Sequence, residues 1–320
     1  MTQCRFYTGA VMLRGTRAVV HRQRGNRMSQ SRSIAEQVRA LFEALTPTER
    51  KVGRALLANY PVAGLETIAQ WAQRADVSGP TVLRLIGKLG FDNYAAFQSA
   101  LRAELELRLQ SPLMRHDPGQ LQGDHDFLAS HAERIAELMR QTAAQVPRAE
   151  FDGAVDLLGE RKHRIWLLGG RLTDPLAAYL CHHLKVVRPD VVHLRGVPAS
   201  WADSLVDMGR PDVLVIFDIR RYWDDALRIA EMAAQRKASV LLFTDQWLSP
   251  VARVARYTLA AHTAGPAGWD SNTPLMMLVD AVIAALNARH WDRISGRLKE
   301  VEAMRARLGE GGEGNQRAAE

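Results

Sequence analysis

Arginine, glycine and aromatic residues gather in two short segments that could hold a small anion. The first, GGRLT, covers residues 169–173, and the second, DIRRYW, covers residues 218–223. Backbone amides of a glycine-rich turn and the guanidinium groups of Arg171, Arg220 and Arg221 suit phosphate, sulfate or carboxylate. No metal-ligand spacing and no Ser/His/Asp order accompanies them, so we predict no metal, no cofactor and no catalytic residue.

A third segment carries hydrogen-bond donors at helical spacing. Thr81, Arg84 and Lys88 form one stripe, Gly87 lies beside it, and an apolar stripe runs along the other side (Val82, Leu85, Ile86 and Leu89). A helix that reads DNA needs this division, with one face for anchoring and one for base edges and phosphates. An ordinary amphipathic helix with a solvated basic face is the alternative.

The elements around this segment are predicted to be short helices between residues 34 and 109. Thr46 and Glu49 form a capping box for a helix to about residue 59, and Thr67 with Gln70 starts another over residues 67–75. Ser78 is expected to cap a helix to Leu89, and Asp92 a last helix through Leu109. The break over residues 76–78 makes the middle pair a helix-turn-helix candidate.

From residue 165 onward the pattern changes to short apolar runs alternating with helical stretches. Five runs are strand candidates: residues 165–168, 191–194, 213–217, 240–243 and 257–259. Continuous apolar strands of this kind indicate a parallel sheet covered on both faces. We therefore predict an all-α helix-turn-helix domain followed by an α/β domain with a five-stranded, doubly wound, flavodoxin-like parallel sheet.

The N-terminal segment resembles the DNA-binding domain of the MurR/RpiR family of bacterial regulators over about residues 45–105. Four motifs carry the likeness: T-x-x-E-x-K-V at 46–52, I-A-x-x-A at 68–72, V-S-x-x-T-V-x-R at 77–84 and K-L-G-F-x-x-Y-x-x-F at 88–97. The resemblance implies that five residues lie at the DNA, and we add Thr67 and Gly79 to these candidates (Ser78, Pro80, Thr81, Arg84 and Lys88). Tyr94 occupies the place of a family aromatic and is interpreted as a core residue.

Residues 150–290 resemble an SIS (sugar isomerase) domain, the partner domain expected in that family. SIS domains cradle phosphosugars with a G-x-G-x-S turn and an S-x-S-G-x-T turn. Here Gly169 keeps the first glycine, Arg171 replaces the second and Thr173 stands for the serine. In the second turn, Asp218 and Arg220 stand at the serines, Arg221 at the glycine and Trp223 at the threonine, so the small hydroxyls are lost. A later T…SP segment persists as Thr244 with Ser249 and Pro250.

Three interpretations of this altered pocket stay open. In the first, the three arginines bind a phosphate, sulfate or carboxylate by charge instead of through a nest of backbone amides; Gly169 and Gly170 are also candidates for effector binding. In the second, an aromatic or cationic ligand is held by Tyr222, Trp223, Trp247 and Asp218. In the third, aspartates pair with the arginines and the pocket is closed (Asp174, Asp218, Asp224 and Asp225).

We expect a regulator and not an enzyme. An SIS-type sugar-phosphate isomerase or lyase is the alternative, but the candidate general bases His182, His183 and Glu231 lie within predicted helices. The expected partners are double-stranded operator DNA, a small effector and a second copy of the chain, as a dimer or tetramer formed through the SIS domain. No apolar run of about 18 residues exists, so no transmembrane helix and no membrane partner are expected. The cysteine usage fits a reducing cytoplasm, and we expect association with the nucleoid when the protein is bound to DNA.

The net charge of +7 is a weak argument for DNA binding, because six arginines in residues 1–27, without an acidic residue, carry most of it. Cys4 and Cys181 lie far apart and predict no disulfide framework. The expected organisation has five parts. Residues 1–30 are a disordered basic tail or an upstream start, 31–110 the DNA-binding domain, 111–125 a linker, 126–308 the SIS domain and 309–320 a disordered tail.

Overall fold

The computed structural model describes residues 33–109, 126–196, 198–265 and 268–309. The predicted N-terminal tail, linker and almost all of the C-terminal tail lie outside the described residues. The four boundaries between the five expected parts therefore stay predictions.

The N-terminal described region is all helical. Three of its helices begin with a capping box, in which a Ser or Thr hydroxyl and a Glu or Gln side chain satisfy each other's backbone amides. Its helices are α1 (Ile34–Leu41), α2 (Pro47–Ala58), α3 (Val62–Leu65), α4 (Ile68–Arg74), α5 (Gly79–Lys88) and α6 (Tyr94–Leu109), with a 3-10 turn at Phe42–Ala44.

Two predicted caps are wrong in detail. Ser78 precedes α5 but makes no side-chain cap, because its hydroxyl lies 3.1 Å from that of Thr81. The cap of α6 is Asn93, whose Oδ1 accepts from the amide of Ala96 at 2.8 Å, and not Asp92. Both helices still begin where the sequence pattern indicated, since a shift of one residue leaves the apolar spacing unchanged.

An aromatic cluster holds α4 and α6 together. Trp71 is fully buried and stacks on Phe97 at 5.4 Å between ring centroids, and its indole N–H donates to the carbonyl of Val52 at 3.3 Å. Tyr94 packs on Phe97, and its hydroxyl donates to the carbonyl of Glu66 at 2.5 Å. These contacts give Tyr94 a packing role and fix the helices that precede and follow α5.

The C-terminal region contains the predicted five-stranded, all-parallel sheet, with strand order β2-β1-β3-β4-β5. This is the flavodoxin-like order, which confirms the predicted fold class. The strands are β1 (Ile165–Gly169), β2 (Val191–His193), β3 (Val213–Asp218), β4 (Ser239–Asp245) and β5 (Tyr257–Ala261).

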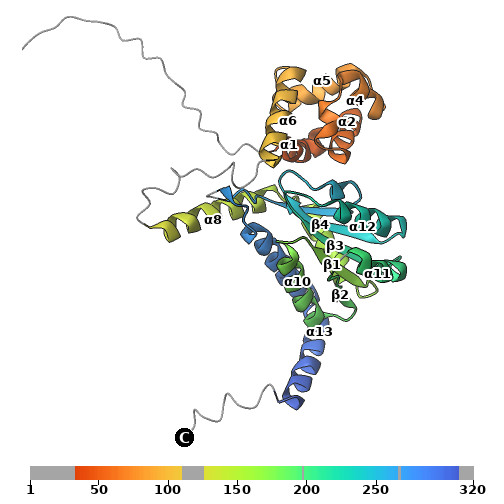
Figure 1. The fold of residues 1–320 in the computed structure, drawn as a ribbon, viewed down its shortest axis with the longest axis vertical. Coiled ribbons are helices and arrows are strands. Elements are labelled where there is room, and N and C mark those ends of the chain that lie inside the picture. Colours follow the sequence, from red (N-terminus) through yellow and green to blue (C-terminus); the bar gives the residue numbers. More distant parts are fainter. Residues whose placement is uncertain (1–32, 110–125, 197, 266–267, 310–320) are drawn as a thin grey trace, which may run out of the picture. The chain divides into compact units, whose positions relative to one another are not determined.

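Helices cover both faces of the sheet (Figure 1). The helices α10 and α13 pack on one face, and α11 and α12 on the other, as their separate buried clusters show. The α13 helix is kinked at His290, whose backbone dihedral angles are not helical. The bounds are α8 (Phe127–Gln145), α9 (Arg148–Gly159), α10 (Asp174–Val187), α11 (Ala202–Asp207), α12 (Asp224–Gln235) and α13 (Thr273–Arg307), with 3-10 turns at Pro198–Trp201 and Pro250–Arg253.

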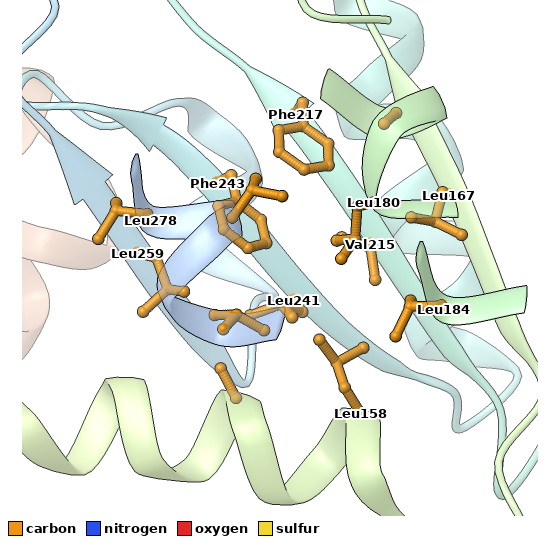
Figure 2. Packing of buried hydrophobic residues seen from close by; sticks show 14 of the residues in the cluster. Leu158, Leu167, Leu180, Leu184, Val215, Phe217, Leu241, Phe243, Leu259 and Leu278 are labelled. Atoms are coloured by element: carbon orange, nitrogen blue, oxygen red, sulfur yellow. The ribbon is translucent and has the colours of Figure 1, made fainter. Parts of the chain in front are cut away.

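Alternate residues of the buried strands serve opposite faces. Val215 and Phe217 of β3 join the cluster with α9, α10 and α13, whereas Leu214 and Ile216 join the cluster with α11 and α12. Figure 2 shows the first cluster, in which Phe217 stacks on Phe243 with ring centroids 4.5 Å apart. Because both faces are buried, the strands read as continuous apolar runs, and their carboxyl ends are held rigidly at one edge.

Candidate functional site

The α5 helix divides into a buried and an exposed face. Val82, Leu85 and Ile86 are at most 1% exposed, as the apolar stripe predicted. The opposite stripe is exposed and falls at i, i+3, i+4, i+7 (Pro80, Leu83, Arg84 and Gly87). The predicted exposed stripe was therefore wrong at Thr81, whose side chain is buried at 4% exposure.

Thr81 positions Arg84 from the buried side. The guanidinium of Arg84 donates to the Thr81 hydroxyl at 3.1 Å, and that hydroxyl also contacts Ser78. A long side chain held at one nitrogen has less freedom to lose when it binds. Arg84 is thus both exposed and oriented.

Lys88 makes an ion pair with Glu49 of α2. Its ammonium lies 2.7 Å from the Glu49 carboxylate, which is only 3% exposed. Burial of Glu49 opposes its ionisation, but hydrogen bonds from Lys88 and from the amide and hydroxyl of Thr46 outweigh it and lower the pKa of Glu49. This ion pair therefore joins the T-x-x-E motif at the start of α2 to the K-L-G-F motif at the end of α5.

The two glycines of α5 have different surroundings. A Cβ on Gly79 would lie 3.3 Å from Ile68 of α4, so this glycine lets α4 and α5 approach closely. A Cβ on Gly87 would meet nothing within 4 Å. Packing inside the chain thus gives no reason for glycine at position 87, which lies on the exposed stripe. Thr67 caps α4 together with Gln70.

Two cavities adjoin the carboxyl ends of β1, β2 and β3 and share Gly170, Arg171 and Trp223. The first opens beside β2, with a volume of about 520 Å³, and the second lies between β1 and β3, with about 510 Å³. The strand order reverses between β1 and β3, the place where α/β sheets of this kind bind ligands. The second cavity is therefore the switch-point cavity of this domain.

The hydroxyls of Thr173 and Thr244 hold the loops of this edge. Thr173 Oγ1 donates to the carbonyl of Phe217 at 2.7 Å and accepts from the amide of Gly170 at 2.8 Å. Thr244 Oγ1 donates to the carbonyl of Asp218 at 2.7 Å and accepts from the amide of Ser249 at 3.0 Å. Each threonine has both of these interactions inside the protein and is at most 2% exposed.

Most polar groups of the DIRRYW loop interact with other residues of the protein. Asp218 accepts from the Ser249 hydroxyl, and Asp245 accepts from the amide of Arg220 and the hydroxyl of Tyr222. The Arg220 guanidinium lies 3.8 Å above the ring centre of Trp247. It also pairs with Asp270 at 3.5 Å.

These contacts correct part of the predicted effector site. Tyr222, Thr244 and Ser249 are not among the residues that line the two cavities. Asp218, Arg220 and Thr173 line the switch-point cavity but are at most 8% exposed and are engaged with the protein. The hydroxyl and aspartate groups were predicted to face the ligand, but the loops use them to fix their own conformation.

Arg171 and Arg221 are arranged differently, because both are exposed and both line the switch-point cavity. Within the described residues, neither makes a hydrogen bond or an ion pair. Arg221 has a backbone φ of 63°, a conformation that non-glycine residues adopt rarely and at a cost. The indole N–H of the neighbouring Trp223 is buried and has no hydrogen-bond partner in the described part of the chain.

The sequence analysis did not identify two further segments that line the cavities. Arg195, Gly196 and Trp201 follow β2 and line the cavity on that side, where Arg195 donates to His193, which donates to Asp174 at 2.7 Å. The position directly after a strand was a usable signal for Arg195. Trp269 and Asn272 precede α13 and line the switch-point cavity, but no strand precedes them closely enough to mark them.

Two family profiles match this chain in the order that the structure shows. Residues 32–107 match the helix-turn-helix domain of the rpiR family, and residues 158–285 match the SIS domain. A helix-turn-helix region joined to an SIS domain defines a class of regulatory proteins. This chain carries an rpiR-family helix-turn-helix domain followed by an SIS domain, and it is similar to regulators with that name.

Relatives with known names match the chain over most of its length. The chain is 29% identical over 257 residues to the bifunctional protein glk of Paraburkholderia xenovorans, which covers 78% of this chain but only 38% of that protein. It is 24% identical to the transcriptional regulator HexR of Escherichia coli over 284 residues, 84% of this chain and 93% of HexR.

Solved structures show the same fold. The sugar isomerase domain of an RpiR transcription factor from Sphaerobacter thermophilus matches 56% of this chain and 99% of that domain, with a TM-score of 0.53 and 23% identity. NanR of Vibrio vulnificus, complexed with ManNAc-6P, matches 86% of this chain and 99% of NanR, with a TM-score of 0.50 and 18% identity.

Proposed function

We propose that this chain is a sequence-specific DNA-binding transcriptional regulator and that α5 is its recognition helix. The carrying observation is the exposed stripe of α5, which presents Arg84 in a fixed orientation while three aliphatic side chains anchor the opposite face. The α5 helix contains no acidic residue, which favours a polyanionic partner. The match to the rpiR-family helix-turn-helix domain and the likeness to HexR support the same function.

The test is the affinity of the full chain for a duplex that it selects from a random library. A bidentate arginine contact to guanine contributes about 1–3 kcal/mol, so Arg84→Ala should weaken binding about fivefold or more. Arg102→Ala removes the same charge from an exposed site on α6 and serves as the control. Unchanged affinity in a variant with both Arg84→Ala and Lys88→Ala would contradict the proposed role of α5.

We also propose that the switch-point cavity binds a small anionic metabolite through Arg171, Arg221 and the indole N–H of Trp223. The support is that two exposed guanidinium groups and an unpaired donor face one cavity, whereas Asp270 and Asp174 are already paired with Arg220 and His193. Phosphorylated sugars are the leading class of ligand, because NanR is complexed with one. Guanidinium groups would then replace the hydroxyls of the usual SIS loop.

Thermal-shift measurements on the full chain test this ligand class. The probes are N-acetylmannosamine 6-phosphate, other hexose phosphates and the matching unphosphorylated sugars. We expect stabilisation by phosphorylated sugars alone, lost in the variant Arg171→Ala with Arg221→Ala and kept in Arg228→Ala. Arg228 is a matched control because it is exposed on α12 and outside both cavities. Stabilisation that survives in the double variant would rule out the proposed contacts.

Regulation would follow from coupling between the two domains. We propose that SIS domains pair two or four copies of the chain, which brings two α5 helices to a two-fold operator, in the cytoplasm. Ligand binding would then change the population of the arrangement that fits the operator. Sedimentation of the full chain with and without DNA measures the stoichiometry, and a monomer on DNA would contradict this arrangement.

An isomerase or lyase activity has less support. His182, His183 and Glu231 are exposed on α10 and α12 and line neither cavity. Among the described residues, no group of three His, Cys, Asp or Glu side chains could hold a metal ion. Nor is any described helix long and apolar enough to cross a membrane. Turnover of a sugar phosphate that is lost with one change in the cavity would overturn the regulatory assignment.

A further inference from the structure

Leu83 is an apolar side chain in the centre of the exposed stripe of α5. It is 45% exposed, whereas the other aliphatic side chains of this helix, Val82, Leu85 and Ile86, are at most 1% exposed. A single exposed leucine is common on protein surfaces and by itself indicates nothing. The neighbours of Leu83 are what make its position informative.

Those neighbours form a surface shaped for a polyanion with apolar groups. Pro80 lies one turn before Leu83 and is exposed, and Arg84 lies beside it with its guanidinium held by Thr81. Gly87 lies one turn after Leu83 and leaves open space where a side chain would stand. The stripe therefore offers a cation and an apolar contact, and its glycine end leaves room for a close approach.

We propose that Leu83 packs against the C5-methyl group of a thymine in the operator and so selects thymine at one position of each half-site. This inference rests on the proposed role of α5 as the recognition helix. The thymine methyl is the apolar group that base edges present in the major groove, and apolar side chains contact it there. The adjacent Arg84 supplies the charge that brings the helix to DNA.

The geometry also sets where the thymine lies. Adjacent residues of a helix are separated by about 1.5 Å along its axis, less than the spacing of adjacent base pairs. Leu83 and Arg84 are adjacent and face the same side. The selected thymine should therefore lie within about two base pairs of the guanine that Arg84 reads.

The first experiment compares the base preferences of the full-length protein and its Leu83→Ala variant, selected from the same random duplex library. Leu83→Ala should lose the thymine preference at one position of each half-site and keep the guanine preference. Leu128→Ala is the matched control, because Leu128 is 77% exposed on α8 and should leave every preference unchanged. Leu83 is exposed, so the variant is expected to fold, which circular dichroism checks.

The second experiment replaces that thymine by deoxyuridine, which lacks only the methyl group. Burial of one methyl group predicts that wild-type affinity falls about fourfold, whereas Leu83→Ala should respond less than twofold. An unchanged preference in Leu83→Ala, or equal responses of both proteins to deoxyuridine, would overturn the inference while the proposed function stands. A change of oligomeric state in Leu83→Ala with unchanged base preference would assign Leu83 to a protein interface and overturn it too. A wild-type protein that selects no motif would overturn the proposed function itself.

Discussion

The α5 helix and the switch-point cavity both combine arginines, glycines and small hydroxyls, but they use these residues in different ways. On α5 one threonine is buried and orients an exposed arginine. At the cavity, two threonines, a serine and Arg220 are all directed inward, and Arg171 and Arg221 remain exposed. In both places, burial separates residues that hold the site from residues free to contact a ligand.

The largest expected effect on stability is at Gly169, where, unlike at Gly87, there is no room for a side chain. A Cβ on Gly169 would fall 2.4 Å from the backbone Cα of Asp174, so the β1–α10 turn cannot accept it without moving. Gly169→Ala should lower the free energy of unfolding by about 3 kcal/mol, the upper end of the usual range for overpacking. Urea denaturation measures it. Gly170→Ala is the control, since its nearest atom would lie 3.4 Å away. Equal stability of Gly169→Ala and wild type would contradict the clash.

A comparison of Thr173 with Arg171 separates a residue that stabilises the loops of the cavity from a residue that is proposed to bind the ligand. Thr173→Val removes two buried hydrogen bonds and should lower the free energy of unfolding by about 2 kcal/mol. Arg171→Ala should change it by less than about 0.5 kcal/mol, because the side chain is exposed. Urea denaturation of both variants, without ligand, gives the two values. If Arg171→Ala were the more destabilising, the guanidinium would serve the fold and the proposed binding role would fail.

On α5, removal of Lys88 should lower the stability of the fold, whereas removal of Arg84 should have little effect on it. Lys88→Met leaves the buried carboxylate of Glu49 without its cation and should cost about 1–3 kcal/mol of stability, whereas Arg84→Ala should cost little.

The pKa of Glu49 is lowered in the folded chain. The stabilising effect of its ionised carboxylate is therefore full above the unfolded pKa, near 4.5, and is lost as the pH falls toward and through the folded pKa. Wild-type stability should therefore fall below about pH 4.5 more steeply than that of Glu49→Gln. Parallel pH profiles of unfolding would contradict the pair.

The smallest expected effect sharpens the function of the exposed stripe. Gly87→Ala adds a methyl group in open space and should stabilise the helix by about 0.5–1 kcal/mol. The same methyl should weaken DNA binding if the DNA backbone approaches Gly87 closely. Denaturation and DNA titration of one variant measure both effects. A variant with higher stability and unchanged affinity would show that position 87 lies away from the DNA.

Much of the fold followed from local pattern. The capping boxes at Thr46 and Thr67 fixed two helix starts, and the five apolar runs fixed five strands. Local signals decide these features because a cap needs residues three apart and a buried strand needs only an apolar run. The caps of α5 and α6 were less predictable, because Ser78, Asp92 and Asn93 are all good capping residues.

The sequence by itself determined the order of the two domains, the strands of the sheet, the buried stripe of α5 and the loss of the hydroxyl turn at residues 218–223. Only the tertiary structure decided which polar groups are free. Thr81, Thr173 and Arg220 were candidates for ligand contact by type and spacing, but each faces a partner from another turn or element. A buried polar group must find a hydrogen-bond partner, and that partner is set by the packing of distant segments, which spacing along the chain does not reveal.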